Sequence, residues 1–256
     1  MKFITRNEIF LLEEIVKKNF SSKYKDSVLG IFWTILNPLL LMALFTICFS
    51  TIFGRNIENF PVYFLCGWCA FSFFTTAISA SMNSLKGNKN ILQRTPAPKY
   101  IFVLGAVISE LLNYIIMLIL LGIVMIFTHA PFYFPTILFS VIPIISLLVM
   151  ITGLGLMLSV VCGYYTDVIH LWNVVSLMIM YASAIFYPMS IIPEQYRQFL
   201  ILNPLYWIID QLRCFIYFGI FPQRLYIFNS LLLSMIIFVF GVIIFKKYES
   251  KKTMKF

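Results

Sequence analysis

Two cysteines stand at the spacing of a redox motif, in the run Cys66-Gly67-Trp68-Cys69. A C-x-x-C pair performs thiol–disulfide chemistry when it lies in a soluble α/β fold with an accessible thiolate. This tetrapeptide lies inside a long apolar run instead. We therefore expect the two cysteines to pack within a helix, and the odd total of five cysteines also argues against a disulfide framework.

A single acidic residue, Glu110, lies in the middle of another apolar stretch. It stands roughly 10 residues into that stretch, which is about 15 Å along a helix. A carboxylate in lipid is costly and so is expected to have a partner or a role. A proton-coupled step, a substrate contact and a structural bond to Asn113 or a neighbouring helix are all open. The structural bond is favoured, because one acid without an intramembrane cation makes a poor proton relay.

Other residue types that carry chemistry are isolated. His129 and His170 have no partners at metal-ligand spacing, so we expect no metal site. A membrane-embedded transferase could use Asp167 with His170, although Asp167 more simply caps a helix. No G-x-x-x-x-G-K-[ST] run occurs, so no ATP-binding loop is predicted. The sequence thus predicts no catalytic residue, metal or cofactor on this chain.

The elements that position these residues are built for lipid. Of the 256 residues, 61% are hydrophobic and 11% are charged, whereas roughly a quarter of the residues in a soluble domain are charged. The mean hydropathy is +0.92. We therefore predict an all-α integral membrane protein that is one transmembrane domain over residues 1–256, so any ATPase must be another chain. The net charge of +9 has no soluble basic face to occupy, which excludes a nucleic-acid partner.

Hydropathy predicts six transmembrane helices and one surface helix. Residues 1–27 mix charged and apolar positions in the pattern of an amphipathic helix that lies at the membrane interface. The expected spans are 28–53, 60–82, 101–127, 136–162, 168–187 and 225–245. In the span 136–162, small residues at 155, 159 and 163 line one face and predict close helix packing.

Charge placement sets the expected topology. With six spans, the N-terminal segment, the loop 83–99 and the C-terminal tail share one side and hold six, four and five cations, or 15 of the 19. Short cytoplasmic loops are enriched in Lys and Arg, so both termini are predicted to be cytoplasmic. A seventh span would place the lysine-rich tail outside. Residues 191–221 are therefore expected to form two short re-entrant helices in the outer leaflet, with Asp210 and Arg213 paired at i, i+3.

The chain resembles a known family along nearly its whole length. The run Tyr24-Lys25-Asp26-Ser27-Val28-Leu29-Gly30-Ile31-Phe32-Trp33, followed by Leu36-Asn37-Pro38-Leu39, resembles the opening of ABC-2 type permeases that export O-antigen, capsule and teichoic acid. Other stretches are similar to that family in order and spacing: Phe45–Ser50 before Phe53-Gly54, Asn83-Ser84-Leu85, Gly87-Asn88, Asp167–His170, Phe186-Tyr187-Pro188, Ile192-Pro193-Glu194 and Leu202-Asn203-Pro204-Leu205.

The resemblance implies a half-transporter. Such a chain forms a homodimer around a central pathway in the cytoplasmic (inner) membrane of a bacterium, and two copies of a separate ATP-binding subunit supply ATP and Mg²⁺. Its substrate would be a lipid-linked polysaccharide, as in lipopolysaccharide biosynthesis or teichoic acid export.

The loop 83–99 is the expected ATPase-coupling segment, because a short helix framed by Gly and Pro can transmit motion to the neighbouring spans. Its candidate residues are Gly87, Asn88, Asn90, Arg94, Pro96 and Pro98. A basic loop that only orients the protein is the alternative. The run Thr95-Pro96-Ala97-Pro98-Lys99 departs from the aromatic and Pro-Arg that the family often has here.

Aromatic rings offer apolar faces on which sugar rings stack, so aromatic residues are candidates for the pathway wall. The candidates are Trp33, Phe71, Phe73, Phe74 and Tyr187, with a lipid-facing position as the alternative for each. The expected outer gate comprises Pro188, Pro193, Pro204, Asp210 and Arg213.

Two other functions stay open from the sequence. One is an ABC-2 exporter of a small hydrophobic compound, and the other is a polytopic lipid-modifying enzyme that acts without an ATPase.

Overall fold

The computed structural model describes residues 6–25, 27–50, 57–94, 97–201 and 203–249, and all regular secondary structure in these ranges is helical. The order and bounds of the elements are α1 (Arg6–Tyr24), α2 (Phe32–Ser50), α3 (Phe60–Gly87), α4 (Lys89–Arg94), α5 (Lys99–Phe127), α6 (Phe134–Phe139), α7 (Val141–Tyr164), α8 (Val168–Ala182), η1 (Met189–Ile191), α9 (Glu194–Ile201), α10 (Pro204–Arg213), η2 (Cys214–Phe218) and α11 (Arg224–Glu249).

Five helical segments are long and apolar enough to cross a membrane, namely α2, α3, α5, α6 with α7, and α11. The multi-pass, all-helical architecture expected from composition is therefore present. The predicted fifth span, 168–187, is helical only over the 15 residues of α8. Its last five residues form a turn in which Ala184 has a left-handed φ of 50°.

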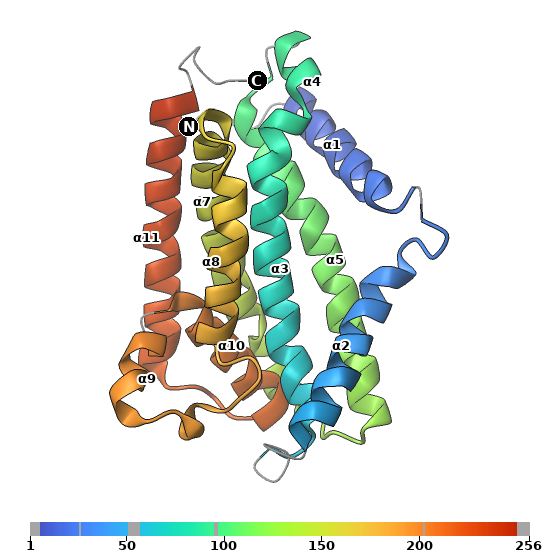
Figure 1. The fold of residues 1–256 in the computed structure, drawn as a ribbon, viewed down its shortest axis with the longest axis vertical. Coiled ribbons are helices and arrows are strands. Elements are labelled where there is room, and N and C mark those ends of the chain that lie inside the picture. Colours follow the sequence, from blue (N-terminus) through green and yellow to red (C-terminus); the bar gives the residue numbers. More distant parts are fainter. Residues whose placement is uncertain (1–5, 26, 51–56, 95–96, 202, 250–256) are drawn as a thin grey trace.

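Helix α3 is the centre of the bundle. It contacts α2, α5, α7, α8 and α10, and it contributes more buried side chains to the main core than any other described helix. Figure 1 shows α2 leaning away from the other long helices, joined at its N-terminal end to α1. α3 also runs to Gly87, five residues past the predicted end of the span. It therefore takes in the start of the predicted loop 83–99, where the Asn83 amide donates back to the Ser79 carbonyl at 2.9 Å.

Small residues set the closest helix contacts. A Cβ at Gly241 of α11 would overlap the carbonyl of Gly153 in α7, so the two backbones touch at this point. The expected small face on α7 is also buried: Gly155 packs on Ser81 of α3, and Ser159 and Gly163 lie in the interior.

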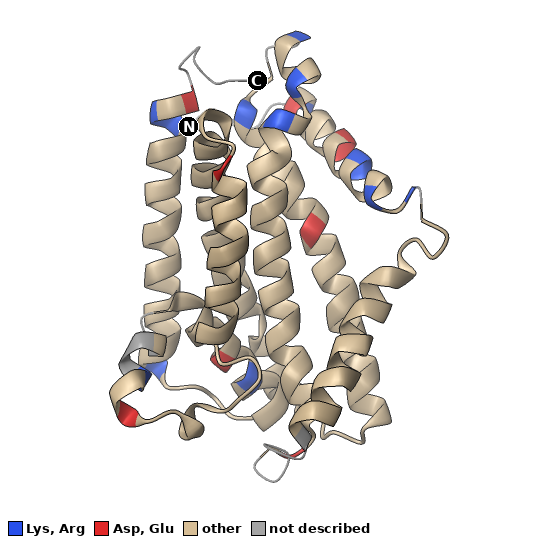
Figure 2. Cartoon of the chain, viewed as in Figure 1, with Lys and Arg blue, Asp and Glu red and all other residues tan. Residues whose placement is uncertain are grey.

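The short elements gather at one end of the bundle. α9, α10 and the start of α11 lie at the end opposite α1 and α4 (Figure 1). The two short helices expected within 191–221 are thus present as α9 and α10, followed by the π-helical turn η2. Charged residues concentrate at the other end, on α1, α4 and the last turns of α11 (Figure 2).

Candidate functional site

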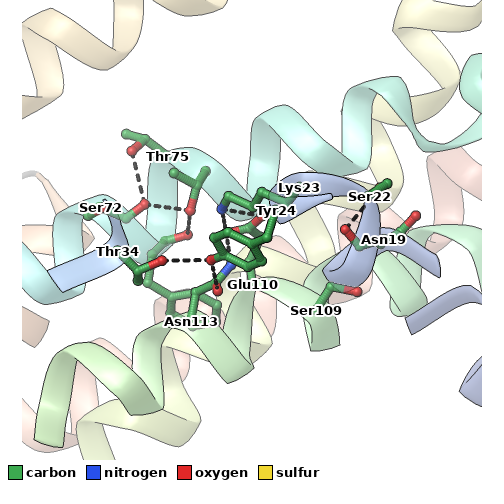
Figure 3. Close-up of polar contacts among 12 residues, drawn as sticks. Asn19, Ser22, Lys23, Tyr24, Thr34, Ser72, Thr75, Ser109, Glu110 and Asn113 are labelled. Carbon is green, nitrogen blue, oxygen red and sulfur yellow. Dashed lines mark hydrogen bonds and ion pairs between the residues drawn. The ribbon is translucent and has the colours of Figure 1, made fainter. Parts of the chain in front are cut away.

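The intramembrane acid Glu110 lies at the centre of a polar network. Its side chain is 11% exposed, and the Lys23 ammonium of α1 forms an ion pair with it. The Lys23 Nζ atom donates to both carboxylate oxygens at 3.0 Å. The Asn113 amide, one helical turn along α5, donates to Oε2 at 3.0 Å. The expected structural bond is confirmed, and a cation from the N-terminal helix accompanies it (Figure 3).

Tyr24, the last residue of α1, extends this network to α2. Its hydroxyl donates to the Asn113 side-chain oxygen at 2.7 Å and lies 2.6 Å from the Thr34 hydroxyl. Because Tyr24 donates to Asn113, Thr34 is the donor in the second bond. The two neighbouring residues Lys23 and Tyr24 thus tie α1 to α5 and α2 (Figure 3).

Packing explains why α1 ends beside Glu110. Ile15 is buried, and a Cβ at Gly105 of α5 would collide with it, so the glycine provides the seat for α1. Leu11 and Leu12 join the same apolar cluster. The apolar side of this amphipathic helix therefore packs on α5, and the helix spans Arg6–Tyr24.

Three cavities meet at Glu110. The inner cavity has a volume of about 330 Å³ and is lined by Lys23, Tyr24, Ser27, Gly30, Trp33, Thr34, Asn37, Pro38, Trp68, Ser72, Phe73, Thr76, Glu110, Asn113, Tyr114 and Met117. The vestibule, of about 370 Å³, is lined by Lys18, Asn19, Ser22, Lys23, Ala80, Asn83, Ser84, Gly87, Asn88, Ala106, Ser109 and Glu110. The lateral cavity, of about 460 Å³, is lined by Thr75, Thr76, Ser79, Ala80, Asn83, Glu110, Trp172, Asn173 and Ser176.

These cavities form a polar groove along α3, which we define as their combined lining. Hydroxyl and amide side chains recur along it, and the Trp172 indole of α8 donates to the Ser79 hydroxyl at 3.1 Å. Five aromatic side chains line the inner cavity, namely those of Tyr24, Trp33, Trp68, Phe73 and Tyr114. Alternating hydrogen-bonding groups and aromatic faces suit a polyhydroxylated ligand.

The five aromatic residues predicted for the pathway separate into two groups. Trp33 is half exposed and lines the inner cavity, as does Phe73, which stacks on Tyr114. The other three do not line the cavities that meet at Glu110. Phe71 is buried beside Trp68, Phe74 is buried against Trp172, and the backbone carbonyl of Tyr187 accepts from the Tyr63 hydroxyl.

The predicted coupling residues lie at the α1 end of the groove. Gly87 ends α3, and the buried Asn88 side chain accepts from the Lys18 ammonium at 2.8 Å. Asn90 and Arg94 are exposed on α4. Pro98 directly precedes α5, whereas Pro96 lies outside the described residues.

The predicted gate prolines each start a short element. Pro188 precedes η1, Pro193 precedes α9, and Pro204 is the first residue of α10. The Asn203 side chain caps α10 by accepting from the Leu205 amide at 3.0 Å.

The expected Asp210–Arg213 ion pair is wrong. No contact within 4 Å joins the two charges, both of which are described. The Arg213 side chain is instead buried: its two terminal nitrogens donate to the carbonyls of Ala184 and Ile185 at 3.0 and 2.8 Å, and its guanidinium lies 3.7 Å from the centre of the Tyr63 ring. The left-handed turn at Ala184 presents these carbonyls, which is why they outcompete Asp210.

The remaining candidate chemistry stays within the helices. Cys66 and Cys69 are buried free thiols, as expected for packing residues. Within the described residues, no group of three His, Cys, Asp or Glu side chains could hold a metal ion. Asp167 is the N-cap of α8 without a side-chain cap bond, and its backbone carbonyl accepts from His170.

Sequence reasoning missed Lys23, Tyr24 and Trp68 as site residues. No local signal marks Lys23 apart from the other cations of residues 1–27. The pairing with Glu110 follows from the docking of α1 on Gly105, which joins residues 87 positions apart.

Comparison with known proteins identifies relatives along most of the chain. A family model for ABC-2 type transporters matches residues 11–217. The O-antigen export system permease protein RfbA of Myxococcus xanthus is 26% identical over 200 residues, 76% of this chain and 75% of that protein. An RfbA of Klebsiella pneumoniae is 25% identical over 242 residues, 93% of this chain and 92% of that protein. The polysialic acid transport protein KpsM of Escherichia coli is 23% identical over 201 residues, 78% of each chain.

Proposed function

Because the chain belongs to the ABC-2 type transporter family, we propose that it is the membrane permease of an ATP-driven exporter that moves a lipid-linked polysaccharide out of the cytoplasm. The relatives named for O-antigen and polysialic acid transport support this substrate class. The proposal covers O-antigen, capsular and teichoic acid polymers as cargo.

The polar groove along α3 is the observation that carries the proposal. A polysaccharide crossing lipid needs hydrogen-bonding partners at membrane depth, where bare polar groups are costly. The inner cavity offers hydroxyls, amides and aromatic side chains beside Glu110. An exporter of small hydrophobic compounds has no use for such a lining, so the groove favours a polyhydroxylated cargo.

Two copies of this chain would enclose the pathway. The groove is half open, since Asn83 and Asn173 at its rim are exposed, and exposed amides in lipid need cover. In a homodimer whose two polar grooves face each other, each chain would cover the exposed amides of the other. On this proposal Trp33 and Trp68 belong to the pathway wall, while Phe71 and Phe74 support it from the core.

Energy would come from a separate ATP-binding subunit, present in two copies with its own ATP and Mg²⁺. Helix α4 is the proposed docking element, because Asn90 and Arg94 are exposed there and α4 follows directly on α3. The cations that gather at this end of the bundle support a cytoplasmic position in the inner membrane for both termini.

The opposite end would form the outer gate. Residues 191–221 form short elements at the end away from α4, and α10 turns back through η2 without crossing the bundle (Figure 1). α8 would be the sixth span, because it is an apolar helix that follows directly on α7 in the chain.

Deletion of the gene in the producing bacterium tests this function. The expected result is that lipid-linked polymer accumulates in the cytoplasm and disappears from the surface, and that the plasmid-borne gene restores export. An unchanged amount of surface polymer in the deletion strain would contradict the proposal.

A further inference from the structure

Lys23 and Glu110 are the two charged residues that line both the vestibule and the inner cavity. The ammonium bridges both carboxylate oxygens at 3.0 Å. The ion pair therefore lies where a space that opens beside α1 meets a space that lies deeper along α3.

The ion pair is one of several contacts that hold α1 in place. Ile15 seats the helix on Gly105, and Lys18 binds Asn88 independently of Lys23. The Lys23 side chain is 43% exposed, so water can solvate its ammonium when the pair separates. The pair can thus separate without unfolding the helix that carries Lys23.

Separation does require a replacement for the ammonium. Glu110 is largely buried within an apolar helix, where an unpaired carboxylate is costly. Asn113 supplies one donor but no charge. A sugar can supply the rest, since its hydroxyls donate to the carboxylate and accept from the ammonium.

Charge balance indicates which sugars fit. Among the described residues that line the inner cavity, Lys23 and Glu110 alone carry formal charges, and these cancel. A neutral segment leaves this balance unchanged. An acidic segment would pair with Lys23 but would face the Glu110 carboxylate across the same gap.

We infer that Lys23 and Glu110 form a gate between the vestibule and the inner cavity, and that a neutral polyhydroxylated segment opens it by taking over the hydrogen bonds of the ion pair. The occupant in this inference rests on the proposed polysaccharide function. The gate itself is inferred from the two charged residues that line both cavities.

Thiol labelling in inside-out membrane vesicles tests the gate. In a Cys48→Ser background, which removes the exposed native thiol, Ser72→Cys places a thiol in the inner cavity and Ser22→Cys places one in the vestibule. A membrane-impermeant methanethiosulfonate is then applied, and the rate of modification is measured. With the ion pair intact, Ser22→Cys is expected to react much faster than Ser72→Cys.

Lys23→Met should raise the rate at Ser72→Cys by about fivefold, which corresponds to a difference of roughly 1 kcal/mol. It should leave the rate at Ser22→Cys unchanged. Lys17→Met is the matched control, because it breaks the exposed Glu14–Lys17 pair on the same helix, and neither residue lines these cavities. Equal rates at Ser72→Cys with and without Lys23 would overturn the gate.

Added oligosaccharides test the occupant on the protein with Lys23 and Glu110 intact. Maltoheptaose, a neutral probe, should accelerate labelling of Ser72→Cys, whereas oligosialic acid of the same length should not. Acceleration by the acidic probe alone, or by neither probe, would overturn the neutral occupant. Labelling does not depend on transport. Export of polymer by the deletion strain would therefore contradict the proposed function, but it would leave the labelling result for the gate unchanged.

Discussion

The Lys18 ammonium donates a hydrogen bond to the side-chain oxygen of Asn88 at 2.8 Å, which joins the N-terminal helix to the residue between α3 and α4. Five residues further along α1, Lys23 reaches Glu110. The proposed ATPase-docking helix and the polar groove are therefore connected through one short helix, so a displacement of α4 has a direct mechanical route to the groove.

Replacing Asn88 should weaken this connection. Asn88→Ala removes the bond from Lys18 and the bond that the Asn88 amide donates to the Ser84 carbonyl. We expect a loss of about 1–3 kcal/mol in stability, measured as a lower thermal unfolding midpoint in detergent. Asn90→Ala is the control, because Asn90 is exposed on α4. Equal midpoints for the two variants would contradict the role assigned to Asn88.

Asn90 should instead report on the partner. Cysteine at position 90 or 94 is expected to crosslink to the co-expressed ATP-binding subunit, since both positions are exposed on α4. Cysteine at position 122 of α5, far from α4 along the chain and within an apolar segment, serves as the negative control. The absence of an adduct at every α4 position would remove the docking role from this helix.

Arg213 should be intolerant of replacement. The two terminal nitrogens of its guanidinium donate to the Ala184 and Ile185 carbonyls, and the guanidinium lies over the Tyr63 ring. Arg213→Met is expected to cost about 2–4 kcal/mol, because charged hydrogen bonds contribute more than neutral ones and two buried carbonyls lose their donor. Arg213→Lys should rescue only part of this, since an ammonium lacks the planar fork.

Arg197 offers the comparison for that measurement. It is partly exposed and donates to the Ile192 carbonyl at 2.9 Å, so Arg197→Met should change the unfolding midpoint much less. Equal unfolding midpoints for Arg197→Met and Arg213→Met would contradict the role of Arg213 in stabilising the turn after α8.

Gly241→Ala should separate α7 from α11. The added methyl would overlap the Gly153 carbonyl, which is backbone and cannot rotate away, and overpacking of this kind costs about 1–3 kcal/mol. Gly122→Ala is the matched control within an apolar helix, since a Cβ there meets nothing within 4 Å. A lower yield of folded protein for Gly122→Ala than for Gly241→Ala would contradict the packing described.

The sequence predicted most of the helices because composition and charge act over long apolar segments. Helix α11 and both ends of α5 lie within four residues of their expected bounds. The bond between Glu110 and Asn113 was also predictable, since residues three apart share a helix face. The interior packing of Gly155, Ser159 and Gly163 followed from the same periodicity.

The tertiary contacts of individual charged side chains were not predictable in this way. The i, i+3 spacing of Asp210 and Arg213 suggested an ion pair, but a left-handed turn nearly 30 residues earlier supplies carbonyls that Arg213 binds instead. Lys23 is at least nine positions from every acidic residue of α1, and the docking of α1 on α5 directs it to Glu110. Both outcomes depend on backbone positions that hydropathy does not encode.

The most direct measurement of the central claim is ATP-dependent movement of lipid-linked polysaccharide into inside-out vesicles that hold this chain and its ATP-binding subunit. The account predicts that polymer becomes resistant to added glycosidase when ATP is hydrolysed, and that Trp33→Ala combined with Trp68→Ala reduces this protection while the complex still assembles. Polymer that stays sensitive to glycosidase in the presence of ATP and an active ATPase would contradict it.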